Sequence, residues 1–260
     1  MPRLNRIIAR GIAETAGVLR PGHTPRAGLR VLMYHSVGSV ATGDALGIYG
    51  IAPARFEQHM AALVAQTGIT VAALAASAAR PQGTQVAVTF DDGYRDNLYR
   101  AAPVLQALQI PFTVFVCSGF LRDPSGNFLS AAELRELSAL PGVSIGSHGA
   151  THVPLTTLDD EQLRSELLTS KAALEDATGR PVDAISYPHG AVDHRVRAAA
   201  ADAGYTVGAC SRFDINAPGR DPLLLCRTDI HANDKRRVFL QKLRGDWDWY
   251  RWRSADPAMS

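Results

Sequence analysis

The sequence predicts an α/β fold built on a parallel sheet that is closed or nearly closed. Beyond residue 27, short apolar runs typical of buried strands alternate with longer amphipathic segments typical of helices. Repeated strand–helix units of this kind place the strands parallel to one another. We expect strands at residues 29–34, 69–71, 86–90, 112–117, 143–147, 184–187, 205–210 and 224–230.

Residues with known end preferences mark the helices between these strands. Pro53 suits the first turn of a helix. Ser130 and Glu133 have the spacing of a capping box. Thr157 precedes a long amphipathic segment that stops at Gly179. These signals predict helices that alternate with the strands.

Length and composition are those of one globular domain. The chain has 260 residues, of which 46% are apolar and 20% charged, enough for a full core in a single α/β domain. We expect the domain at residues 28–245, a basic helix and linker at 1–27, and an aromatic and basic tail at 246–260. For this tail, packing onto the domain is favoured over stacking on sugar rings or lying at a membrane surface.

Charge and hydropathy argue against several classes of function. A net charge of +2 is too small to indicate a nucleic-acid partner. The apolar stretches fall short of the ~18 residues that span a bilayer, and residues 1–20 lack the apolar segment of a secretory signal. We therefore expect a cytoplasmic protein. The N-terminal helix is expected to dock on the domain, with weak peripheral contact to anionic lipid as the alternative; the sequence does not indicate an oligomeric state.

Three cysteines, Cys117, Cys210 and Cys226, are odd in number and far apart in the sequence. Each falls within or beside an expected strand. We therefore interpret them as small core residues of a protein in a reducing compartment, rather than as metal ligands or a disulfide.

Two adjacent carboxylates, Asp91 and Asp92, follow the apolar run at 86–90 and precede Gly93. Charged groups at the C-terminal end of a buried strand are costly unless they bind or catalyse. Neighbouring side chains of an extended chain point to opposite sides, so Gly93 must bend the backbone before both acids can serve one site. The pattern suggests one carboxylate on a metal and one that moves a proton. A polar loop in which Asp91 caps the next helix is the alternative.

Two histidines, His148 and His152, follow the apolar run at 143–147. Gly149 and Pro154 favour a loop over a helix for this segment. Histidines four residues apart can chelate one ion from such a loop. Together with an aspartate they provide three protein ligands and leave room for water, which is the ligand count of a catalytic zinc site.

Three motifs now define a resemblance to a known family. They are TFDDG at residues 89–93, S-H-x-x-x-H at 147–152 and S-Y-P-H-G at 186–190. In order and spacing they resemble the polysaccharide deacetylases of the NodB-homology type (carbohydrate esterase family 4), hydrolases that remove N-acetyl groups from amino sugars. The resemblance implies a distorted (β/α)7-type barrel and a carbohydrate as the substrate.

Two further segments are similar to one branch of that family. Residues 32–37 (LMYHSV) and 56–60 (FEQHM) resemble the branch associated with bacterial exopolysaccharide and surface-glycan synthesis. The resemblance extends over roughly residues 29 to 245. The loop at 36–50 contains four glycines and leaves the expected mouth of the barrel, so we expect it to provide substrate contacts.

The resemblance implies a role for each motif residue. It makes Asp92, His148 and His152 the ligands of one divalent metal, zinc by default, with cobalt, nickel or iron as alternatives. Asp91 would act as the general base for a metal-activated water. The backbone N–H of His189 would stabilise the oxyanion.

The sequence departs from the family pattern at three points. Many relatives carry an arginine where Ser186 stands, which pairs with the catalytic aspartate; Arg227 is the candidate replacement, with a surface charge as the alternative. An aspartate–tryptophan motif is absent, and residues 210–214 occupy its place. A late leucine–x–histidine motif that supplies the general acid is hard to place. Weaker candidates for the surroundings of the substrate are Tyr187, Pro188, Arg227 and His231.

Two histidines compete for the role of general acid. His35 follows the first expected strand, and the resemblance to the exopolysaccharide branch gives the acid role to the histidine of this early Tyr-His pair. His231 is the late candidate. We favour His35, because its position and the branch agree, and a core histidine bonded to a carbonyl is the alternative.

Three functions are consistent with these observations. The first is a metal-dependent de-N-acetylase acting on an acetamido sugar in a glycan or in its lipid-linked precursor. The second is an amidohydrolase acting on another small amide, because specificity lies in loops. The third is a catalytically silent glycan-binding relative, which the four retained residues Asp91, Asp92, His148 and His152 argue against.

Overall fold

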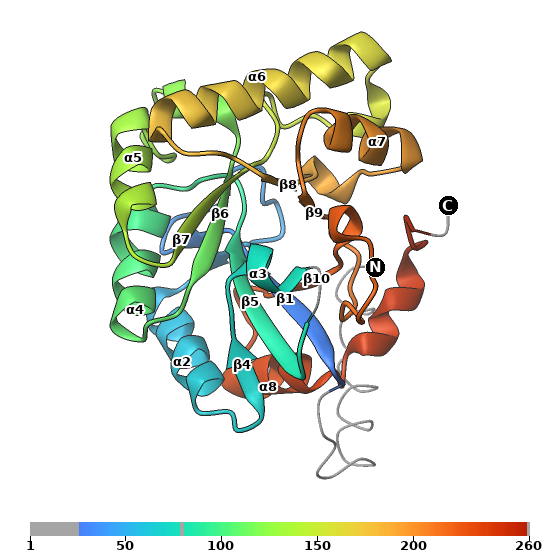
Figure 1. The fold of residues 1–260 in the computed structure, drawn as a ribbon. Coiled ribbons are helices and arrows are strands. Elements are labelled where there is room, and N and C mark those ends of the chain that lie inside the picture. The colour runs from blue at the N-terminus through green and yellow to red at the C-terminus, as the bar shows by residue number, and fades with distance from the viewer. Residues whose placement is uncertain (1–25, 79–80, 259–260) are drawn as a thin grey trace.

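A parallel sheet curves into a nearly closed barrel of seven strands, as the sequence predicts (Figure 1). The computed structural model describes residues 26–78 and 81–258. The strands are β1 (Gly28–Tyr34), β2 (Ser36–Val37), β3 (Gly50–Ile51), β4 (Ile69–Val71), β5 (Thr84–Phe90), β6 (Phe112–Val116), β7 (Val143–Ser147), β8 (Ala184–Ser186), β9 (Val207–Ala209) and β10 (Arg227–Asp229). The barrel order is β10-β1-β5-β6-β7-β8-β9, and β4 pairs with β5 outside this order.

The barrel is closed at its seam by a parallel bridge between Ala209, at the end of β9, and Leu225, just before β10. Helices surround the strands (Figure 1). They are α2 (Pro53–Val64), α3 (Leu74–Ala78), α4 (Ala102–Ala107), α5 (Ala131–Ala139), α6 (Asp160–Thr178), α7 (His194–Asp202) and α8 (Arg236–Arg244). Short turns of 3-10 helix are η2 (Ser118–Arg122), η3 (Leu155–Thr157), η4 (Pro188–Gly190), η5 (Pro222–Leu224) and η6 (Asp248–Arg253), and η1 (Asn97–Ala101) is a π-helical turn. In the described part of the chain, no helix is both long and apolar enough to cross a bilayer.

Each expected strand is present, and the differences lie at the ends. The largest is at the last strand, predicted to begin at residue 224, where η5 still occupies the chain and β10 begins at Arg227. The cause is local, because Pro222 suits a first helical turn and the Asp221 side chain accepts the N–H of Leu223. The helix expected within residues 1–20 lies outside the described residues.

Capping side chains define the starts of two of the three helices that the sequence marked, and the third, α2, begins at Pro53 as expected. Ser130 forms the predicted capping box at the start of α5. The long helix α6 is capped by Asp159 and Gln162 rather than by Thr157, which belongs to η3. It ends at Gly179, whose φ of 67° is the left-handed conformation that glycine adopts without strain.

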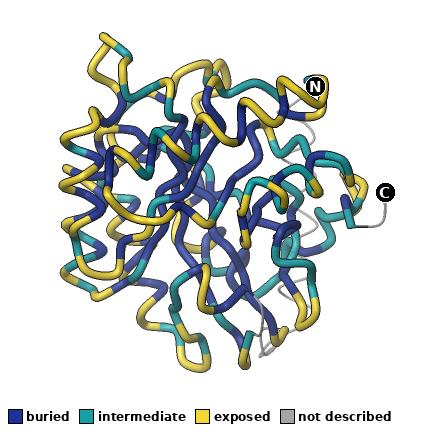
Figure 2. The backbone as a smooth tube through the Cα atoms, turned by 45° about the horizontal axis from the view of Figure 1, so that its top comes forward, coloured by how far each residue is buried: buried dark blue, intermediate teal, exposed yellow. Residues whose placement is uncertain are grey.

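The strands at the centre of the molecule are largely buried, and exposed segments lie around them (Figure 2). Alternation along the strands gives the barrel two apolar layers. The outer layer joins the strands to the surrounding helices and includes Leu32, Val86, Val88 and Phe90. The inner layer is smaller, and α3 covers it at one end; its members are Leu29, Val31, Leu74, Ala78, Ala87, Phe115, Val207, Ala209 and Leu225. The next inward position on β5 is Thr89, and Asp91 follows directly after the strand. The interior therefore changes from apolar to charged at the C-terminal ends of the strands.

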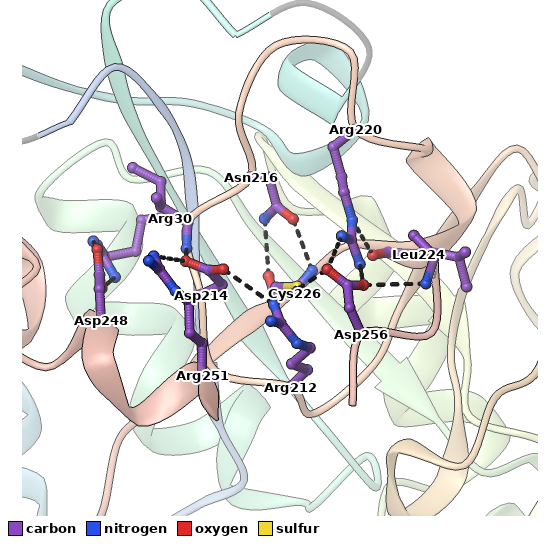
Figure 3. Close-up of polar contacts among 12 residues, drawn as sticks. Arg30, Arg212, Asp214, Asn216, Arg220, Leu224, Cys226, Asp248, Arg251 and Asp256 are labelled. Atoms are coloured by element: carbon purple, nitrogen blue, oxygen red, sulfur yellow. Dashed lines mark hydrogen bonds and ion pairs between the residues drawn. The ribbon is translucent and has the colours of Figure 1, made fainter. Parts of the chain in front are cut away.

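The C-terminal segment is tied to the seam side of the barrel by ion pairs (Figure 3). Asp248, the first residue of η6, pairs with Arg30 of β1 at 2.9 Å, and both side chains are buried. Further along, Asp256 pairs with Arg220 at 2.8 Å. These contacts hold the tail against the domain.

A buried histidine joins α2 to the first strand and to α8. Tyr34 donates its hydroxyl to His59 Nδ1 at 3.2 Å, and His59 Nε2–H donates to the carbonyl of Asp234 at 2.8 Å. The ring stacks on Phe239 with a centroid separation of 4.3 Å. Both ring nitrogens are thus used by the neutral form. Burial lowers the pKa of His59 to about 4, although the Asp234 carbonyl opposes this shift.

This histidine predicts a loss of stability in mild acid. Its pKa is about 4 in the folded chain and about 6.5 in an unfolded one, so the unfolded state binds more protons between these values. The free energy of unfolding should therefore fall between pH 6.5 and 4, by roughly 3 kcal/mol at most from His59. Urea unfolding at pH 7 and pH 4.5 measures this.

The variant His59→Gln should show a smaller loss over the same interval, because it has no group to titrate. The matched control is His194→Gln, at the exposed first residue of α7, which should keep the wild-type dependence. Equal pH dependence in His59→Gln and wild type would contradict the assignment.

Candidate active site

The three sequence motifs meet at the C-terminal ends of β5, β7 and β8, around a cavity of about 470 Å³. In parallel barrels this end collects the functional loops. The residues that line the cavity are Met33, His35, Ala41, Thr42, Gly43, Tyr49, Asp91, Asp92, Tyr94, Phe120, Phe128, His148, His152, Tyr187, His189, Gly190, Ser211 and Arg227.

Both carboxylates of the first motif face this cavity because the backbone turns between them. The turn begins one residue earlier than the sequence predicted: Asp92 itself has a φ of 74°, and Gly93 continues the left-handed path with a φ of 78°. This conformation costs a non-glycine residue free energy, so the surrounding contacts must impose it. A Cβ on Gly93 would also lie 2.9 Å from a methyl group of Val116, which leaves no room for another residue.

Asp92, His148 and His152 form a group that could hold a cation. Their ligand atoms lie within 4.8 Å of one another. Asp92 Oδ1 lies 3.4 Å from His148 Nε2 and 3.3 Å from His152 Nε2. This oxygen is buried and has no hydrogen-bond partner among the described residues. A buried acceptor left without a donor is costly, and a cation would satisfy it.

The histidine tautomer agrees with this arrangement. His148 Nδ1–H donates to the carbonyl of Ser186 at 2.7 Å, which leaves Nε2 unprotonated and facing Asp92. Burial lowers the pKa of His148, although Asp91 and Asp92 oppose it. Burial would also lower the pKa of His152, but the close approach and the negative charge of the Asp92 carboxylate outweigh burial and raise that pKa.

Asp91 is held by a buried ion pair. Arg227 donates from Nη1 to Oδ1 at 2.7 Å and from Nη2 to Oδ2 at 2.8 Å. Ser186 donates its hydroxyl to the same Oδ2 at 3.2 Å and accepts from Arg227 Nη2 at 2.9 Å. Burial alone would raise the pKa of Asp91, but the charge of Arg227, followed by that of His148, outweighs it and holds the pKa well below its usual range. Arg227 of β10 thus makes the contact with Asp91 that was expected of an arginine at position 186.

Glu166, which sequence reasoning missed, shapes the loop that carries both histidines. Its Oε1 accepts the backbone N–H groups of Ala150 at 2.8 Å and Thr151 at 2.6 Å, and the Thr151 hydroxyl at 3.0 Å. These bonds support the left-handed conformation of His152, whose φ is 62°. The available signal was a glutamate on the apolar face of α6, beside Leu163 and Leu167.

The third motif contributes backbone more than side chains. His189 has a φ of 58°, and the residue lines the cavity. The His189 ring lies 3.2 Å from the carbonyl of His152. Tyr187 donates its hydroxyl to the carbonyl of Leu223 at 2.9 Å, away from the cavity, and Pro188 is buried.

The two candidate acids differ in position. His35 lines the cavity, its ring lies 4.3 Å from that of Tyr49, and its Nδ1 is buried without a partner among the described residues. Asn97 anchors this residue through a 2.9 Å bond to its carbonyl. His231 does not line the cavity, and its Nε2 lies 4.0 Å from Asp229 Oδ2.

Aromatic residues that the motifs did not identify form part of the cavity wall. Phe120 lies 4.3 Å from Phe128 and 5.8 Å from His152, measured between ring centroids. The loop at 36–50 contributes residues 41–43 and Tyr49, as its position suggested, and the N–H of Thr42 donates to the hydroxyl of Tyr94 at 2.7 Å. Only Tyr94 had a sequence signal, because it follows the first motif directly.

Sequence comparisons place this geometry in a family. The family model for polysaccharide deacetylase matches residues 78–208. YxkH of Bacillus subtilis (strain 168), which carries the name of a polysaccharide deacetylase, is 32% identical over 187 residues, 70% of this chain and 64% of that protein. Chitin deacetylase 1 of Cryptococcus neoformans var. grubii is 30% identical over 119 residues, 46% of this chain and 24% of that protein. The chain thus spans less than two thirds of the length of either relative.

Solved structures share the fold. BC0361, a polysaccharide deacetylase from Bacillus cereus, superposes with a TM-score of 0.71 at 28% identity, covering 83% of this chain and 69% of that one. The deacetylase PplD of Streptococcus pyogenes has a TM-score of 0.74 at 23% identity, covering 85% and 99%, a likeness of fold alone. Because the family match covers half of the chain and includes all three motifs, the protein belongs to the polysaccharide deacetylase family (NodB homology, carbohydrate esterase family 4).

Proposed function

We propose that the protein is a metal-dependent hydrolase that removes N-acetyl groups from an acetamido sugar, in an N-acetylglucosamine-type glycan or its precursor. The observation that carries the proposal is the placing of a paired carboxylate, Asp91, beside the Asp92–His148–His152 group at one cavity. Family membership and the names of the relatives support a carbohydrate substrate.

In this proposal Asp92, His148 and His152 hold one divalent ion, zinc by default, with cobalt, nickel or iron as alternatives. When bound, the ion would polarise the acetyl carbonyl and lower the pKa of a water. The unpartnered oxygen of Asp92 and the tautomer of His148 both suit a cation. These residues therefore bind and orient, and do not need to move protons themselves.

Asp91 would be the general base. It is ionised because Arg227 holds its pKa down, although burial opposes this, and it lies at the cavity floor beside the ligand group. As water attacks the acetyl carbon, Asp91 would take one of its protons. The N–H of His189 would donate to the oxyanion that develops on the former carbonyl oxygen.

His35 would be the general acid. Its ring lies at the cavity beside Tyr49, and one buried ring nitrogen has no partner among the described residues. A protonated imidazole can give its proton to the leaving nitrogen, so that the sugar departs as a neutral amine. The apolar wall of Phe120 and Phe128 would offer a face for a sugar ring.

Acetate release from chito-oligosaccharides, measured together with metal content, tests the proposed function. Release of acetate by metal-loaded protein supports the de-N-acetylase. Metal without release, but with hydrolysis of other small amides, would favour the amidohydrolase. Sugar binding with neither metal nor hydrolysis would mean a silent glycan-binding relative and would overturn the proposal.

The first site prediction separates the two adjacent carboxylates. Asp91→Asn should abolish turnover and leave metal binding intact, because the base is not a ligand. Asp92→Asn should weaken metal binding, because it removes the charged oxygen that lies nearest both histidines. Metal content by mass spectrometry and acetate release decide this, and equal metal loss in both variants would show that the division is wrong.

The second prediction concerns the relocated arginine. Arg227→Gln removes the charge that holds the pKa of Asp91 down, so that pKa should rise and the acid limb of the kcat/KM profile should move to higher pH. The rate at neutral pH should fall by roughly 10²–10⁴, the usual worth of a general base. Ser186→Ala is the control, because it keeps both bonds from Arg227 to Asp91 and should change the profile little. An unshifted acid limb in Arg227→Gln would count against the role.

The third prediction concerns the acid. His35→Ala should lower kcat by roughly 10²–10⁴ with metal still bound, because an amine leaving group needs a proton. Hydrolysis of an activated ester, whose leaving group needs no proton, should survive much better. His231→Ala is the matched control and should be mild, because this residue lies outside the cavity lining. Equal losses on both substrates, or a larger loss in His231→Ala, would assign His35 a structural role.

A further inference from the structure

Two cysteines lie side by side at the seam of the barrel, although the sequence separates them. Ala209 and Leu225 form the bridge that closes the barrel, and the N–H of Cys210 donates to the carbonyl of Leu225 at 2.9 Å. The residues that follow the bridge on the two segments are Cys210 and Cys226. Paired strands lie about 4.8 Å apart, within the ~4.4–6.8 Å that Cα atoms span in disulfides. Both thiols are free and buried.

The surroundings of this pair favour a reactive thiol. Hydrogen bonding from the Cys226 thiol lowers the pKa of Cys210, although burial opposes this shift. Arg212 Nη1 lies 3.7 Å from Cys226 Sγ (Figure 3). The charges of Arg227 and Arg220 also lower the pKa of Cys210, and a lowered pKa favours the thiolate, the form that reacts. The bond to Cys210 and burial raise the pKa of Cys226, which therefore stays a thiol. The third cysteine differs from Cys210, because burial raises the pKa of Cys117 to about 12.

The cysteine pair also contacts Arg227, the residue that pairs with Asp91 in the candidate active site. Cys226 directly precedes Arg227. The carbonyl of Cys210 accepts Arg227 Nε at 2.9 Å. The same two backbone segments therefore carry the thiols and hold the arginine that pairs with Asp91 at 2.7 Å.

We propose that Cys210 and Cys226 form a redox site, at which a peroxide converts the dithiol to an intrachain disulfide across the barrel seam. The position of Arg227 makes the active site sensitive to that bond. As the sequence analysis expected, all three cysteines are free and buried in the core; the proposal gives two of them a further role.

The chemistry balances with hydrogen peroxide as the oxidant. The Cys210 thiolate attacks one peroxide oxygen, the O–O bond breaks, and the departing hydroxide takes up a proton to become water, leaving a sulfenic acid. The Cys226 sulfur then attacks the Cys210 sulfur, the S–O bond breaks, and hydroxide leaves with the Cys226 proton as a second water. Two thiols and one peroxide thus give one disulfide and two waters.

The C-terminal segment covers this site from outside. Asp256 pairs with Arg220 at 2.8 Å and with Arg212 at 3.4 Å, and Arg212 contacts the Cys226 sulfur (Figure 3). Removing the charge of Asp256 should loosen this cover. Asp256→Asn should therefore oxidise several-fold faster than wild type. Asp246→Asn, which removes the ion pair with Arg244 rather than one with Arg212 or Arg220, is the matched control.

The effect on activity rests on the proposed function. To form a disulfide, the Cβ atoms of Cys210 and Cys226 must move closer together. This movement shifts the backbone directly before Arg227 and the carbonyl of Cys210 that accepts its Nε. A displacement of this kind next to a catalytic group should lower kcat by roughly tenfold to a hundredfold. Dithiothreitol should restore the rate.

The experiment treats the full chain with hydrogen peroxide and counts thiols in the unfolded product. We expect the count to fall from three to one, with a mass loss of two hydrogens and a peptide linking Cys210 to Cys226. Cys117→Ala should still form the link, whereas Cys226→Ala should not. Should Cys226→Ala fail to fold, the wild-type peptide map remains decisive.

Three unchanged thiols, or oxygen added to Cys210 without a link, would overturn the proposal. So would a link that involves Cys117. The thiol count and peptide map do not depend on hydrolysis. If the reduced protein forms the disulfide but releases no acetate from chito-oligosaccharides, the proposed function fails and the redox site stands.

Discussion

The buried ion pair between Asp91 and Arg227 connects the first motif to the far end of the sheet. A carboxylate this deeply buried stays ionised only beside a compensating charge. Removing one member of such a pair leaves the other as an unpaired buried charge, which is strongly destabilising. Arg227 also donates to Ser186 and to the carbonyl of Cys210, so one guanidinium contacts β5, β8 and the end of β9. The charge state of Asp91, the proposed base, and the packing at the barrel seam therefore depend on the same side chain.

Backbone conformation around the cavity adds a second constraint. Among the described residues, four non-glycine residues have a positive φ, and three of them, Asp92, His152 and His189, line the cavity. Each holds a conformation that costs free energy in isolation. The contacts that impose it include the hydrogen bonds that Glu166 accepts from the loop before His152. Such contacts keep the polar groups of these three residues directed into the cavity.

Local patterns predicted most of the fold, and contacts between distant segments account for the rest. Apolar periodicity located the strands, and the capping residues located α5, because both signals lie within a few residues. The role of Asp92 in the turn could not be read locally, since a tertiary environment overrides its preference for extended or helical backbone. Glu166 and the pairing of Cys210 with Cys226 depend on segments that meet only after folding.

The position of Arg227 has a consequence for how the chain can be divided. The region that matches the family carries all three motifs. Arg227, which pairs with the proposed base Asp91, and the proposed acid His35 lie on either side of that region. Those two residues lie on β10 and directly after β1, strands that pair with each other in the sheet. The chain before the three motifs and the chain after them therefore form one wall of the cavity together. A fragment limited to the motifs would keep the proposed metal ligands but lack both Arg227 and His35. The smallest unit with a complete site is therefore set by the circular order of the barrel strands rather than by the motif boundaries.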